Sequence, residues 1–434
     1  METDWFRVEQ KTVQTKLYVA LKLITQIKYF KTMKIYRLLF LLFACPLFIG
    51  NAQTVTIKNM SDHDITDYVA EVPLKKLKIS IGNYVVVSND GTVVPLEVVT
   101  DLKGNGSAVF PIAKLEANST ETFKIRKGTA DQYPKRTYAE LAHKIGGKFN
   151  GNRYEGGYSW VKPNYMQVPG SFRDHAYYIK YEGPGWESDK VAYRFYLDQR
   201  NAIDAFGKKT PGIVLPAVGV DGYDNYHNMA DWGMDNMKVG KTLGIGSIGY
   251  FDGTQAVRVE KRDSVICFIQ ADGKIRSQVN TTYFGWDVDV NKFNLKSLIS
   301  IDAGSKASRM ELFADKNVDN LTTGIIKNKN TELIKSAEDL GKWAYIATFG
   351  KQSLNDDNLG FAIFYKKKQL KALTEDAINH LVVLQPENGY AEYYFMASWE
   401  MDWDSAKDRA SFLKGVEEQL NRLNGEVEVK VKRR

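Results

Sequence analysis

Residues 256–304 read AVRVEKRDSVICFIQADGKIRSQVNTTYFGWDVDVNKFNLKSLISIDAG. Within this stretch, β-branched and aromatic residues alternate with polar ones, and Gly, Asp and Asn stand between the runs. This period of two predicts antiparallel strands joined by short turns. Similar runs recur from Ala176 to Trp399, without the strand–helix alternation that is typical of a parallel sheet. We therefore predict a mainly β chain built around a large antiparallel β-sandwich.

A smaller β region precedes this sandwich. Residues 54–127 show the same alternation, punctuated by Asn-Asp-Gly and Gly-Asn-Gly turns, which is typical of a small sandwich. A polar, helix-compatible segment at 132–144 follows and marks the boundary. The predicted domains are therefore a small β-sandwich at 53–130 and a large one at 131–434, the latter a supersandwich similar to galactose mutarotase.

Few helices are expected. Apolar residues recur at helical spacing in 405–423, where Ser405 can cap the start and Asn424-Gly425 ends the pattern. The segments 333–343 and 374–380 are further helical candidates.

The N-terminus contains an export signal. Met33 to Arg37 form a basic segment, the apolar run Leu38 to Ile49 follows, and Gly50-Asn51-Ala52 offers small residues for cleavage. We predict a leader at 1–52, in which Met33 is the true start, residues 33–52 are the signal peptide and Gln53 is the first mature residue. Residues 1–32 read as an over-extended start, with a real helix as the alternative. The mature protein is expected to be periplasmic or secreted, without an integral membrane segment.

Cys45 raises the alternative of a lipoprotein. Leu42 to Cys45 loosely resembles a lipobox, but Phe43 is bulky, Pro46 follows, and the apolar run continues beyond the cysteine. Soluble export is therefore favoured over a lipid anchor. The remaining cysteine, Cys267, lies in an apolar strand-like run and is expected to be buried, so no internal disulfide can form.

The charge argues against a nucleic-acid partner. The formal net charge is +7, from 59 Lys and Arg against 52 Asp and Glu. Residues 1–52 carry eight Lys and Arg against three Asp and Glu, which leaves 51 against 49 for the rest of the chain. A nearly neutral mature chain lacks the basic surface that binds nucleic acid.

The most informative stretch for function runs from Phe172 to Lys238, where aromatic residues stand beside carboxylates and cations in segments broken by Gly and Pro. Such surfaces bind sugars, because C–H faces stack on rings while hydroxyl groups need charged or amide partners. The candidate substrate-binding residues are Trp186, Tyr196, Arg200, Tyr226, Asp231, Trp232 and Lys238.

Two histidines in this stretch are candidates for proton transfer. His175 follows Asp174 directly, and His227 lies in a polar, turn-rich segment with Asp224 and Asp231 nearby. An imidazole can accept or donate a proton near neutral pH when a carboxylate fixes its tautomer. The alternative is that both are loop histidines bonded to backbone.

The same segment offers a candidate metal site. Asp224, His227 and Asp231 are spaced three and four apart, so that a helical turn would place them on one face, and His with two carboxylates can bind a divalent ion. The glycines and aromatics around them argue instead for a loop. No cofactor is expected, with a divalent metal as the alternative.

Arg194 is the candidate carboxylate clamp. Alternation in 191–200 sends Tyr193 and Phe195 to one face of a strand and Arg194 and Tyr196 to the other. If the apolar face is core, the polar face can present a guanidinium to an acidic sugar. The alternative is a cross-strand Arg/Asp pair on a solvated sheet.

Two other enzyme classes have little support. Gly240 to Gly249 contains Gly-Lys-Thr, but Asp235 stands where a phosphate loop needs its first glycine and no helix pattern follows. The nucleophile elbow of a serine hydrolase is missing from the sequence.

The run YYIKYEGPGWESDKVAYRFYLDQRNAIDAFGKK at 177–209, with YDNYHNMADWGMD at 223–235, resembles a family of exported Bacteroidetes proteins labelled as a domain of unknown function. The resemblance covers nearly the whole mature chain. The family is associated with polysaccharide-utilisation gene clusters, and some members are implicated as oligosaccharide dehydratases acting on the unsaturated uronic acid ends that lyases leave on ulvan. The resemblance therefore implies a carbon–oxygen lyase with an acidic oligosaccharide as substrate.

That chemistry needs a base for a carbon-bound proton, a cation for the carboxylate and an acid for the departing hydroxyl. We expect His227 or His175 as base, Arg194 as clamp, and Tyr223, Tyr226 or Tyr196 as acid, with Trp186 and Trp232 as stacking platforms. Two alternatives stay open. One is a non-catalytic glycan-binding sandwich, and the other is a glycoside hydrolase that uses two of the carboxylates Glu182, Glu187, Asp231 and Asp235.

Overall fold

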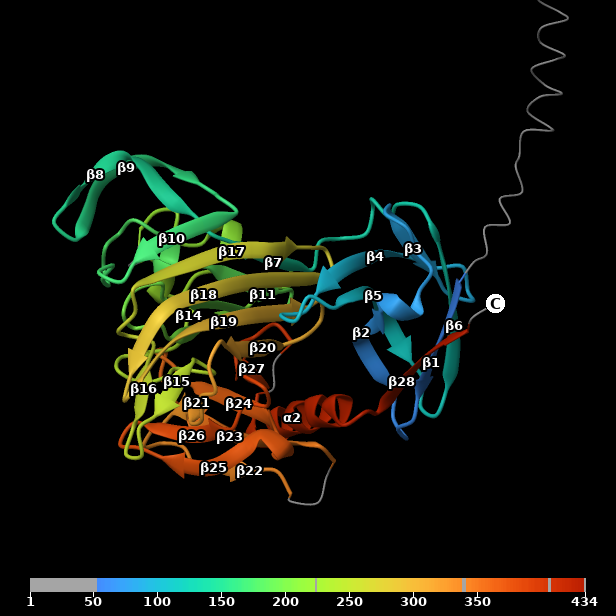
Figure 1. Cartoon of the computed structure of the whole chain (residues 1–434). Helices are drawn as coiled ribbons and strands as arrows, with labels where there is room; N and C mark the ends of the chain where they lie inside the picture. Colours follow the sequence, from blue (N-terminus) through green and yellow to red (C-terminus); the bar gives the residue numbers. More distant parts are fainter. Residues whose placement is uncertain (1–52, 223–224, 338–340, 405–406, 433–434) are drawn as a thin grey trace, which may run out of the picture. The chain divides into compact units, whose positions relative to one another are not determined.

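The computed structural model describes residues 53–222, 225–337, 341–404 and 407–432. This part of the chain is mainly β, with several antiparallel sheets and one α-helix, so the predicted fold class is confirmed (Figure 1). The predicted leader lies outside the described residues, as do Tyr223, Asp224 and Ser405. Within the described part, no helix is both long and apolar enough to cross a membrane.

The N-terminal region forms a seven-stranded sheet with the strand order β2-β5-β4-β3-β6-β1-β28. Alternating Val, Ile and Phe residues of these strands, among them Val55, Ile57 and Phe110, form its own hydrophobic core. The strands are β1 (Gln53–Asn59), β2 (Ile65–Pro73), β3 (Tyr84–Val87), β4 (Val93–Thr100), β5 (Gly106–Leu115), β6 (Thr120–Lys127) and β28 (Val427–Lys432).

The last strand corrects the predicted boundary at residue 130. Strand β28 pairs antiparallel with β1, so that Val429 lies opposite Ile57. The valines of β28 also pack on the core of the small region. Strand β28 therefore completes the N-terminal sheet. It pairs with the edge strand β1, whose backbone groups would otherwise lack a partner, and this pairing places its valines on the core.

The large region is built around a nine-stranded sheet with the order β10-β17-β18-β19-β20-β27-β24-β23-β22. Its longest strands, β18 and β19, come from the sequence stretch 256–304. The strands are β10 (Tyr165–Pro169), β17 (Ser264–Asp272), β18 (Arg276–Val288), β19 (Asn291–Asp302), β20 (Ala307–Ala314), β27 (Tyr390–Trp399), β24 (Asn358–Lys366), β23 (Trp343–Lys351) and β22 (Ile334–Lys335).

Two five-stranded sheets share one hydrophobic core with this large sheet. The first consists of β14 (Gly233–Asp235), β13 (Ile203–Lys208), β12 (Ala192–Phe195), β11 (Gly185–Ser188) and β7 (Thr137–Glu140). The second consists of β16 (Ala256–Arg258), β15 (Gly249–Phe251), β21 (Leu321–Ile326), β26 (Asn379–Leu384) and β25 (Leu370–Glu375). A separate hairpin, β8 (His143–Asn150) with β9 (Arg153–Val161), completes the region. Cys267 is buried in the shared core, as expected.

Helix α2 (Arg409–Leu423) covers the other face of the nine-stranded sheet. Its apolar residues Phe412, Val416 and Leu420 are buried against strand residues of that sheet. The predicted helix is confirmed, but it begins later than expected. The carboxylate of Asp408 accepts a hydrogen bond from the backbone N–H of Ser411, and the Ser411 side chain bonds back to the backbone of Asp408, which makes a capping box.

The other helical expectations are wrong. The segment 333–343 contains β22 and the start of β23, and 132–144 contains β7 and the start of β8. The segment 374–380 is the turn between β25 and β26, where the Asp376 carboxylate accepts from the backbone N–H of Asn379 at 2.6 Å. His380 consequently lies in a strand. Pairing with a neighbouring strand outweighs weak helix propensity in such short segments.

Candidate functional site

The site is built on the first five-stranded sheet, because its two faces have opposite character. Trp186, Tyr193 and Phe195 point into the shared core. The residues between them in the strands carry charge and point to the second face, as the alternation predicted. These are Glu140, Glu187, Arg194, Asp204 and Asp235.

The second face is covered by chain rather than by solvent. The Lys180 ammonium donates to the Glu140 carboxylate at 2.7 Å, and the backbone N–H of Leu215 donates to Glu187 at 2.8 Å. Tyr181, Leu215 and Tyr226 of the covering segments pack with sheet residues in one apolar cluster. The charges of this face are therefore buried, and each must be neutralised or hydrogen bonded.

Arg194 lies at the centre of this covered face. One of its terminal nitrogens lies 2.8 Å from the carboxylate of Asp204 and 2.6 Å from that of Asp235. The other donates to the Tyr226 hydroxyl at 2.9 Å and lies 3.5 Å from Glu182. A single guanidinium thus holds carboxylates from two neighbouring strands and from the covering segment.

Two buried tyrosines complete the arginine's surroundings. The Tyr196 hydroxyl donates to Asp204 at 2.9 Å, and the guanidinium carbon of Arg194 lies 4.7 Å from the centre of the Tyr196 ring. Burial, and then the charge of Asp235, raise the pKa of Asp204 to about 7. Burial also raises the pKa of Tyr226 well above its ordinary value. Both phenols are therefore neutral hydrogen-bonding groups near neutral pH.

His227 lies at the surface end of this network. Its Nε2 is 3.2 Å from Oδ2 of Asp235, and its ring packs on Tyr226 at a centroid distance of 4.5 Å. The histidine side chain is 42% exposed, whereas Asp235 is completely buried. A buried carboxylate behind an accessible imidazole fixes the orientation and the tautomer of the ring.

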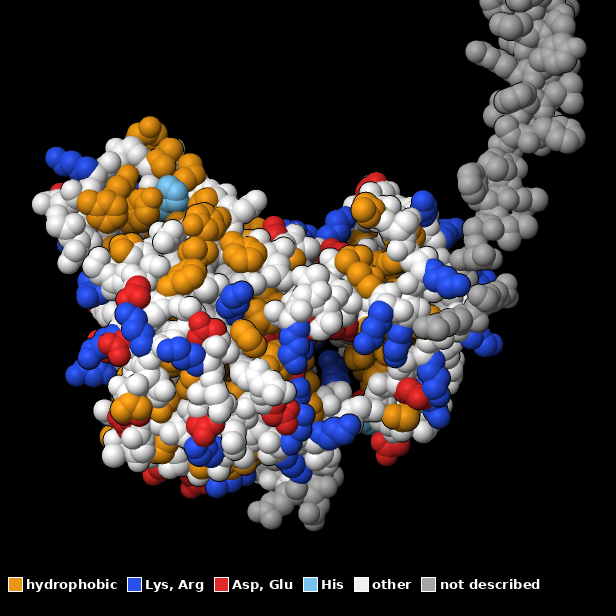
Figure 2. Space-filling model, in the orientation of Figure 1, with side chains coloured by type: hydrophobic (Ala, Val, Ile, Leu, Met, Phe, Trp, Pro, Cys, Tyr) orange, Lys and Arg blue, Asp and Glu red, His pale blue; other side chains and the backbone are white. Residues whose placement is uncertain are grey.

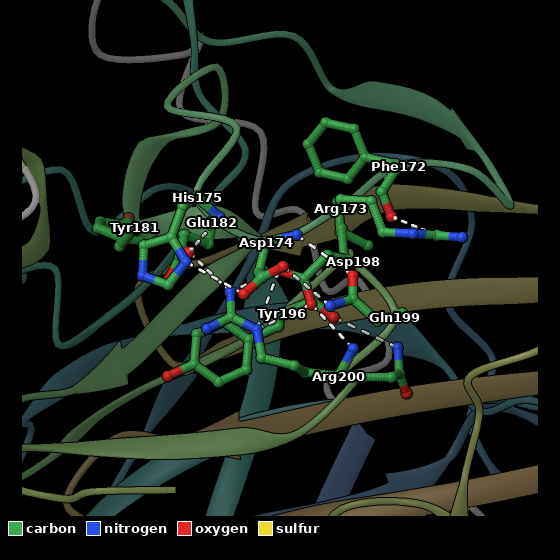
Figure 3. Close-up of polar contacts among 12 residues, drawn as sticks. Phe172, Arg173, Asp174, His175, Tyr181, Glu182, Tyr196, Asp198, Gln199 and Arg200 are labelled. Carbon is green, nitrogen blue, oxygen red and sulfur yellow. Dashed lines mark hydrogen bonds and ion pairs between the residues drawn. The ribbon is translucent and has the colours of Figure 1, made fainter. Parts of the chain in front are cut away.

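His175 lies at another end of the network (Figure 3). Its Nδ1 is 3.1 Å from Asp174, and its backbone N–H donates to Glu182 at 3.2 Å. The Glu182 carboxylate also accepts from Arg200 at 2.6 Å. The His175 side chain is 62% exposed. A chain of contacts through Glu182, Arg194 and Asp235 thus joins the backbone of His175 to the imidazole of His227.

The backbone that carries His175 is strained. Among the described residues, eleven besides glycine have positive φ, and seven of these are Asp or Asn, which tolerate that conformation. The other four are His175, Tyr177, Tyr181 and Glu182. Such conformations persist only where the surrounding contacts enforce them, and they cluster at functional sites.

A cavity of about 620 Å³ lies next to the segment that carries His175, since Arg173 and Gln199 line it and the Gln199 amide donates to the Asp174 carboxylate at 3.0 Å. Arg173 and Arg262 donate to backbone carbonyls, and within the described ranges neither lies within ion-pair distance of a carboxylate. The lining also contains Lys261 and Lys292 together with the carboxylates of Glu260, Asp263 and Asp287, so it carries only a small excess of positive charge.

Two predicted roles are wrong. Arg194 is 1% exposed and its terminal nitrogens are held by Asp204, Asp235 and Tyr226, so it cannot clamp a substrate carboxylate. Trp186 is also 1% exposed, because alternation in β11 places it on the core face, where it stacks on Tyr193 at 5.7 Å. It cannot be a platform for a sugar.

The remaining candidates separate into three groups. Tyr196, Arg200 and Tyr226 belong to the network, and Arg200 lies over the Tyr196 ring at 3.8 Å (Figure 3). Trp232 is partly exposed and packs on Phe206. Asp231 and Lys238 are exposed at the surface. Tyr223 lies outside the described residues.

Of the predicted metal set, the structure describes His227 and Asp231. His227 ends the 3-10 turn Asn225–His227 and lies against Asp235, and Asp231 is exposed. Asp224 lies outside the described residues. In the part of the chain that the structure describes, no group of three or more His, Cys, Asp or Glu side chains is placed to hold a metal ion.

Sequence reasoning missed Asp204, gave Asp198 no role in the site, and considered Glu182 and Asp235 for hydrolysis. Asp204 lies directly opposite Arg194 in the β12–β13 pair. The polar turn between these strands, which contains Gln199 to Asn201, could have predicted this hairpin register. The Asp198 carboxylate forms short ion pairs with the Arg200 guanidinium. Two opposite charges close together in a loop sequence do not show whether their side chains pair.

A family model described as a domain of unknown function, DUF4861, matches residues 57–429. An uncharacterized protein, P7, from Formosa agariphila is 26% identical over 279 residues, which cover 57% of this chain and 66% of the relative, slightly less than two thirds of its length.

Two solved structures from Enterococcus faecalis are similar over 89% of this chain at 10% identity: a protein in glycosyl hydrolase family 38, with a TM-score of 0.41, and an alpha-mannosidase, with a TM-score of 0.42. The matches cover 48% and 46% of those chains, so this chain spans about half their length.

Proposed function

The chain belongs to the DUF4861 family, a domain of unknown function, and on that premise we propose that it is an exported enzyme acting on acidic oligosaccharides. We assign it the reaction of a dehydratase, a carbon–oxygen lyase that removes water from unsaturated uronic acid ends. The observation that carries the proposal is the accessible imidazole of His227 on the buried carboxylate of Asp235. The family resemblance of 177–209 and 223–235 points to the same chemistry.

In this proposal His227 is the base. The imidazole accepts the carbon-bound proton while its Nε2–H is donated to Asp235, and the carboxylate stabilises the imidazolium that forms. The C–H electron pair forms the new double bond as the C–O bond breaks. His175, held by Asp174, donates a proton to the departing hydroxyl, which leaves as water.

The substrate carboxylate needs a cation other than Arg194. We assign this role to Arg173, which lines the cavity next to the His175 segment and is exposed; within the described part of the chain it donates to the carbonyls of Gly170 and Phe172. Arg194 acts from beneath the site as a positioning residue, because it fixes Asp235 and Glu182. Neutralising the carboxylate makes the adjacent carbon-bound proton easier to remove.

The products of one incubation test the proposed class. The purified mature chain is incubated with unsaturated oligosaccharides released from ulvan by a lyase, and products are measured by mass spectrometry. A dehydratase gives a product of the same chain length that is lighter by one water. Unchanged ligand with saturable binding would instead indicate a glycan-binding protein, and a released monosaccharide would indicate a hydrolase.

The geometry disfavours the hydrolase among these classes. Of the four carboxylates considered for hydrolysis, Glu187 and Asp235 are fully buried and Glu182 is 7% exposed, whereas Asp231 is exposed, so this set offers one accessible carboxylate where the reaction needs two. Carboxylates that are closed off by covering chain cannot flank a glycosidic bond, as that reaction requires.

A further inference from the structure

The β8–β9 hairpin carries exposed aromatic side chains that the proposed reaction does not use. Tyr158 is 82% exposed and Phe149 is 50% exposed. Figure 2 shows hydrophobic side chains gathered over this hairpin, at the upper left of the view. We call the surface formed by the exposed Phe149 and Tyr158 and the partly exposed Trp160 the hairpin platform. Large aromatic residues that remain accessible to solvent often mark a binding surface.

The Tyr158 ring contacts the backbone at Gly146. A Cβ built on Gly146 would overlap this ring, and Gly146 has a φ of +86°, so only glycine suits both the conformation and the contact. Gly147 lies opposite Gly156 in the hairpin, which removes side chains from the adjoining surface. The ring is therefore supported at Gly146, while most of its surface is open to a ligand.

Phe149 is held by other rings. Its ring centroid lies 5.1 Å from that of Tyr154 and 5.2 Å from that of Tyr178. Tyr154 is buried beneath it, and its hydroxyl accepts a hydrogen bond from the backbone N–H of Gly147 at 2.8 Å. The aromatic surface is thus ordered before any ligand arrives, which reduces the entropy lost on binding.

The hairpin is bonded to the segments that carry both histidines. The backbone N–H of Tyr154 donates to Ala176 at 2.7 Å, next to His175 in the chain. The Trp160 indole donates to the carbonyl of Val220 at 3.0 Å, in the segment that leads to His227. The hairpin platform therefore adjoins the proposed site.

The charge of the hairpin complements an acidic ligand. Strands β8 and β9 carry one carboxylate, Glu155, and three cations, which are Lys144, Lys148 and Arg153. The Lys144 ammonium lies 5.4 Å from the centre of the Trp160 ring, and the Arg153 guanidinium lies 4.3 Å from that of Tyr177. Cations beside aromatic planes suit a sugar that carries both C–H faces and carboxylate or sulfate groups.

We propose that the hairpin platform is a second sugar-binding subsite, which holds the acidic oligosaccharide by units beyond its reacting end. The inference rests on the proposed function for the orientation of the oligosaccharide, whose reacting end lies at the histidines. Binding at the hairpin platform does not itself require turnover. Tyr158 stacks on the face of one pyranose ring, and Lys148 and Arg153 attract its acidic substituents. A long oligosaccharide then spans from the hairpin to the histidines.

Binding to ligands of two lengths tests this subsite. Calorimetry measures the affinity of the mature chain and of Y158A for an unsaturated ulvan tetrasaccharide and for the corresponding disaccharide. We expect Y158A to weaken tetrasaccharide binding about tenfold and to leave the disaccharide unchanged, since a lost stacking contact accounts for a change of that size. Y158F keeps the ring and should bind as the wild type does. Val290→Ala removes an equally exposed side chain outside the hairpin and is the matched control.

Three outcomes would overturn the subsite: unchanged tetrasaccharide affinity in Y158A, an equal loss for both ligands, or a self-associating wild type that Y158A makes monomeric. The proposed function fails separately. If the wild type binds the tetrasaccharide through Tyr158 but releases no water from it, the subsite stands and the dehydratase does not. If Y158A binds the tetrasaccharide normally and releases water from it, the dehydratase stands and the subsite does not.

Discussion

The Nε2 atom of His227 lies 3.2 Å from the Oδ2 atom of Asp235, and that same oxygen lies 2.6 Å from the guanidinium of Arg194. One buried carboxylate oxygen thus connects an accessible imidazole to a buried arginine. The carboxylate stays fixed by the arginine while the histidine reaches solvent. This arrangement resembles a positioned acid–base group more than a surface ion pair, which would be exposed on both sides.

Replacing Asp235 should abolish most of the activity without removing the histidine. In Asp235→Asn the side chain cannot stabilise an imidazolium, so we expect turnover to fall by roughly 10² or more, the scale of a lost acid–base contribution. The rate of water loss from the oligosaccharide measures this. Asp356→Asn, at an exposed position with a φ that Asn tolerates, is the control and should turn over normally. Comparable rates in both variants would exclude a role for Asp235.

Removing Arg194 should destabilise the protein strongly. In Arg194→Met, the carboxylates of Asp204, Asp235 and Glu182 lose their shared cation inside the covered face. We expect a loss of about 3–5 kcal/mol in the free energy of unfolding, the usual cost of leaving buried charges uncompensated.

Urea denaturation at neutral pH measures that loss. Arg173→Met is the control, because Arg173 is exposed and donates only to backbone carbonyls, and its effect should stay within about 0.5 kcal/mol. Equal stability of the two variants would contradict the central place of Arg194.

Asp204 should make stability depend on pH. Burial and the charge of Asp235 raise its pKa in the folded protein to about 7, whereas an unfolded Asp titrates near about 4. Between these values the folded state binds the proton and the unfolded state does not, so the contribution of Asp204 to stability falls as the pH rises through this window. Above it the contribution is constant.

The comparison that isolates Asp204 is Asp204→Asn, which keeps an acceptor for Arg194 and Tyr196 but does not titrate. Urea midpoints of the wild type should decline relative to those of this variant from about pH 4 to about pH 7. A difference that does not vary with pH would show that Asp204 is ionised throughout.

Trp186 should affect stability and not sugar binding. Trp186→Ala removes a ring that stacks on Tyr193 in the shared core, so we expect a loss of about 3–5 kcal/mol in the free energy of unfolding. The folded variant should bind the oligosaccharide as the wild type does. A variant of normal stability with weakened binding would restore the stacking role that its burial argues against.

The alternation of residues predicted much of the fold and one face of the site. It placed Tyr193 and Phe195 in the core and Arg194 on the opposite face, and it predicted the strands around 256–304. A different signal indicated the two exposed histidines: His175 and His227 stand in polar segments of the sequence with carboxylates nearby. Local pattern is informative here because each strand has only two faces.

The pattern could not predict that the charged face of the sheet is buried. The covering segments that carry Tyr181 and Tyr226 bury the charged face, so Arg194 became an internal ion-pair partner and not a clamp. These segments are irregular, and nothing in their local sequence shows what they cover. The pairing of β28 with β1 was missed for a similar reason, because it joins strands that are more than 350 positions apart in the sequence, as Ile57 and Val429 are.

The most direct measurement of the central claim is the rate at which one water is lost from an unsaturated ulvan oligosaccharide, followed by mass spectrometry for the wild type, His227→Gln and His63→Gln. His63 is as exposed as His227 and also lies beside carboxylates, but it belongs to the small N-terminal region. The account predicts water loss by the wild type and by His63→Gln, and almost none by His227→Gln. Equal rates in all three proteins, or a wild type that leaves the oligosaccharide mass unchanged, would contradict it.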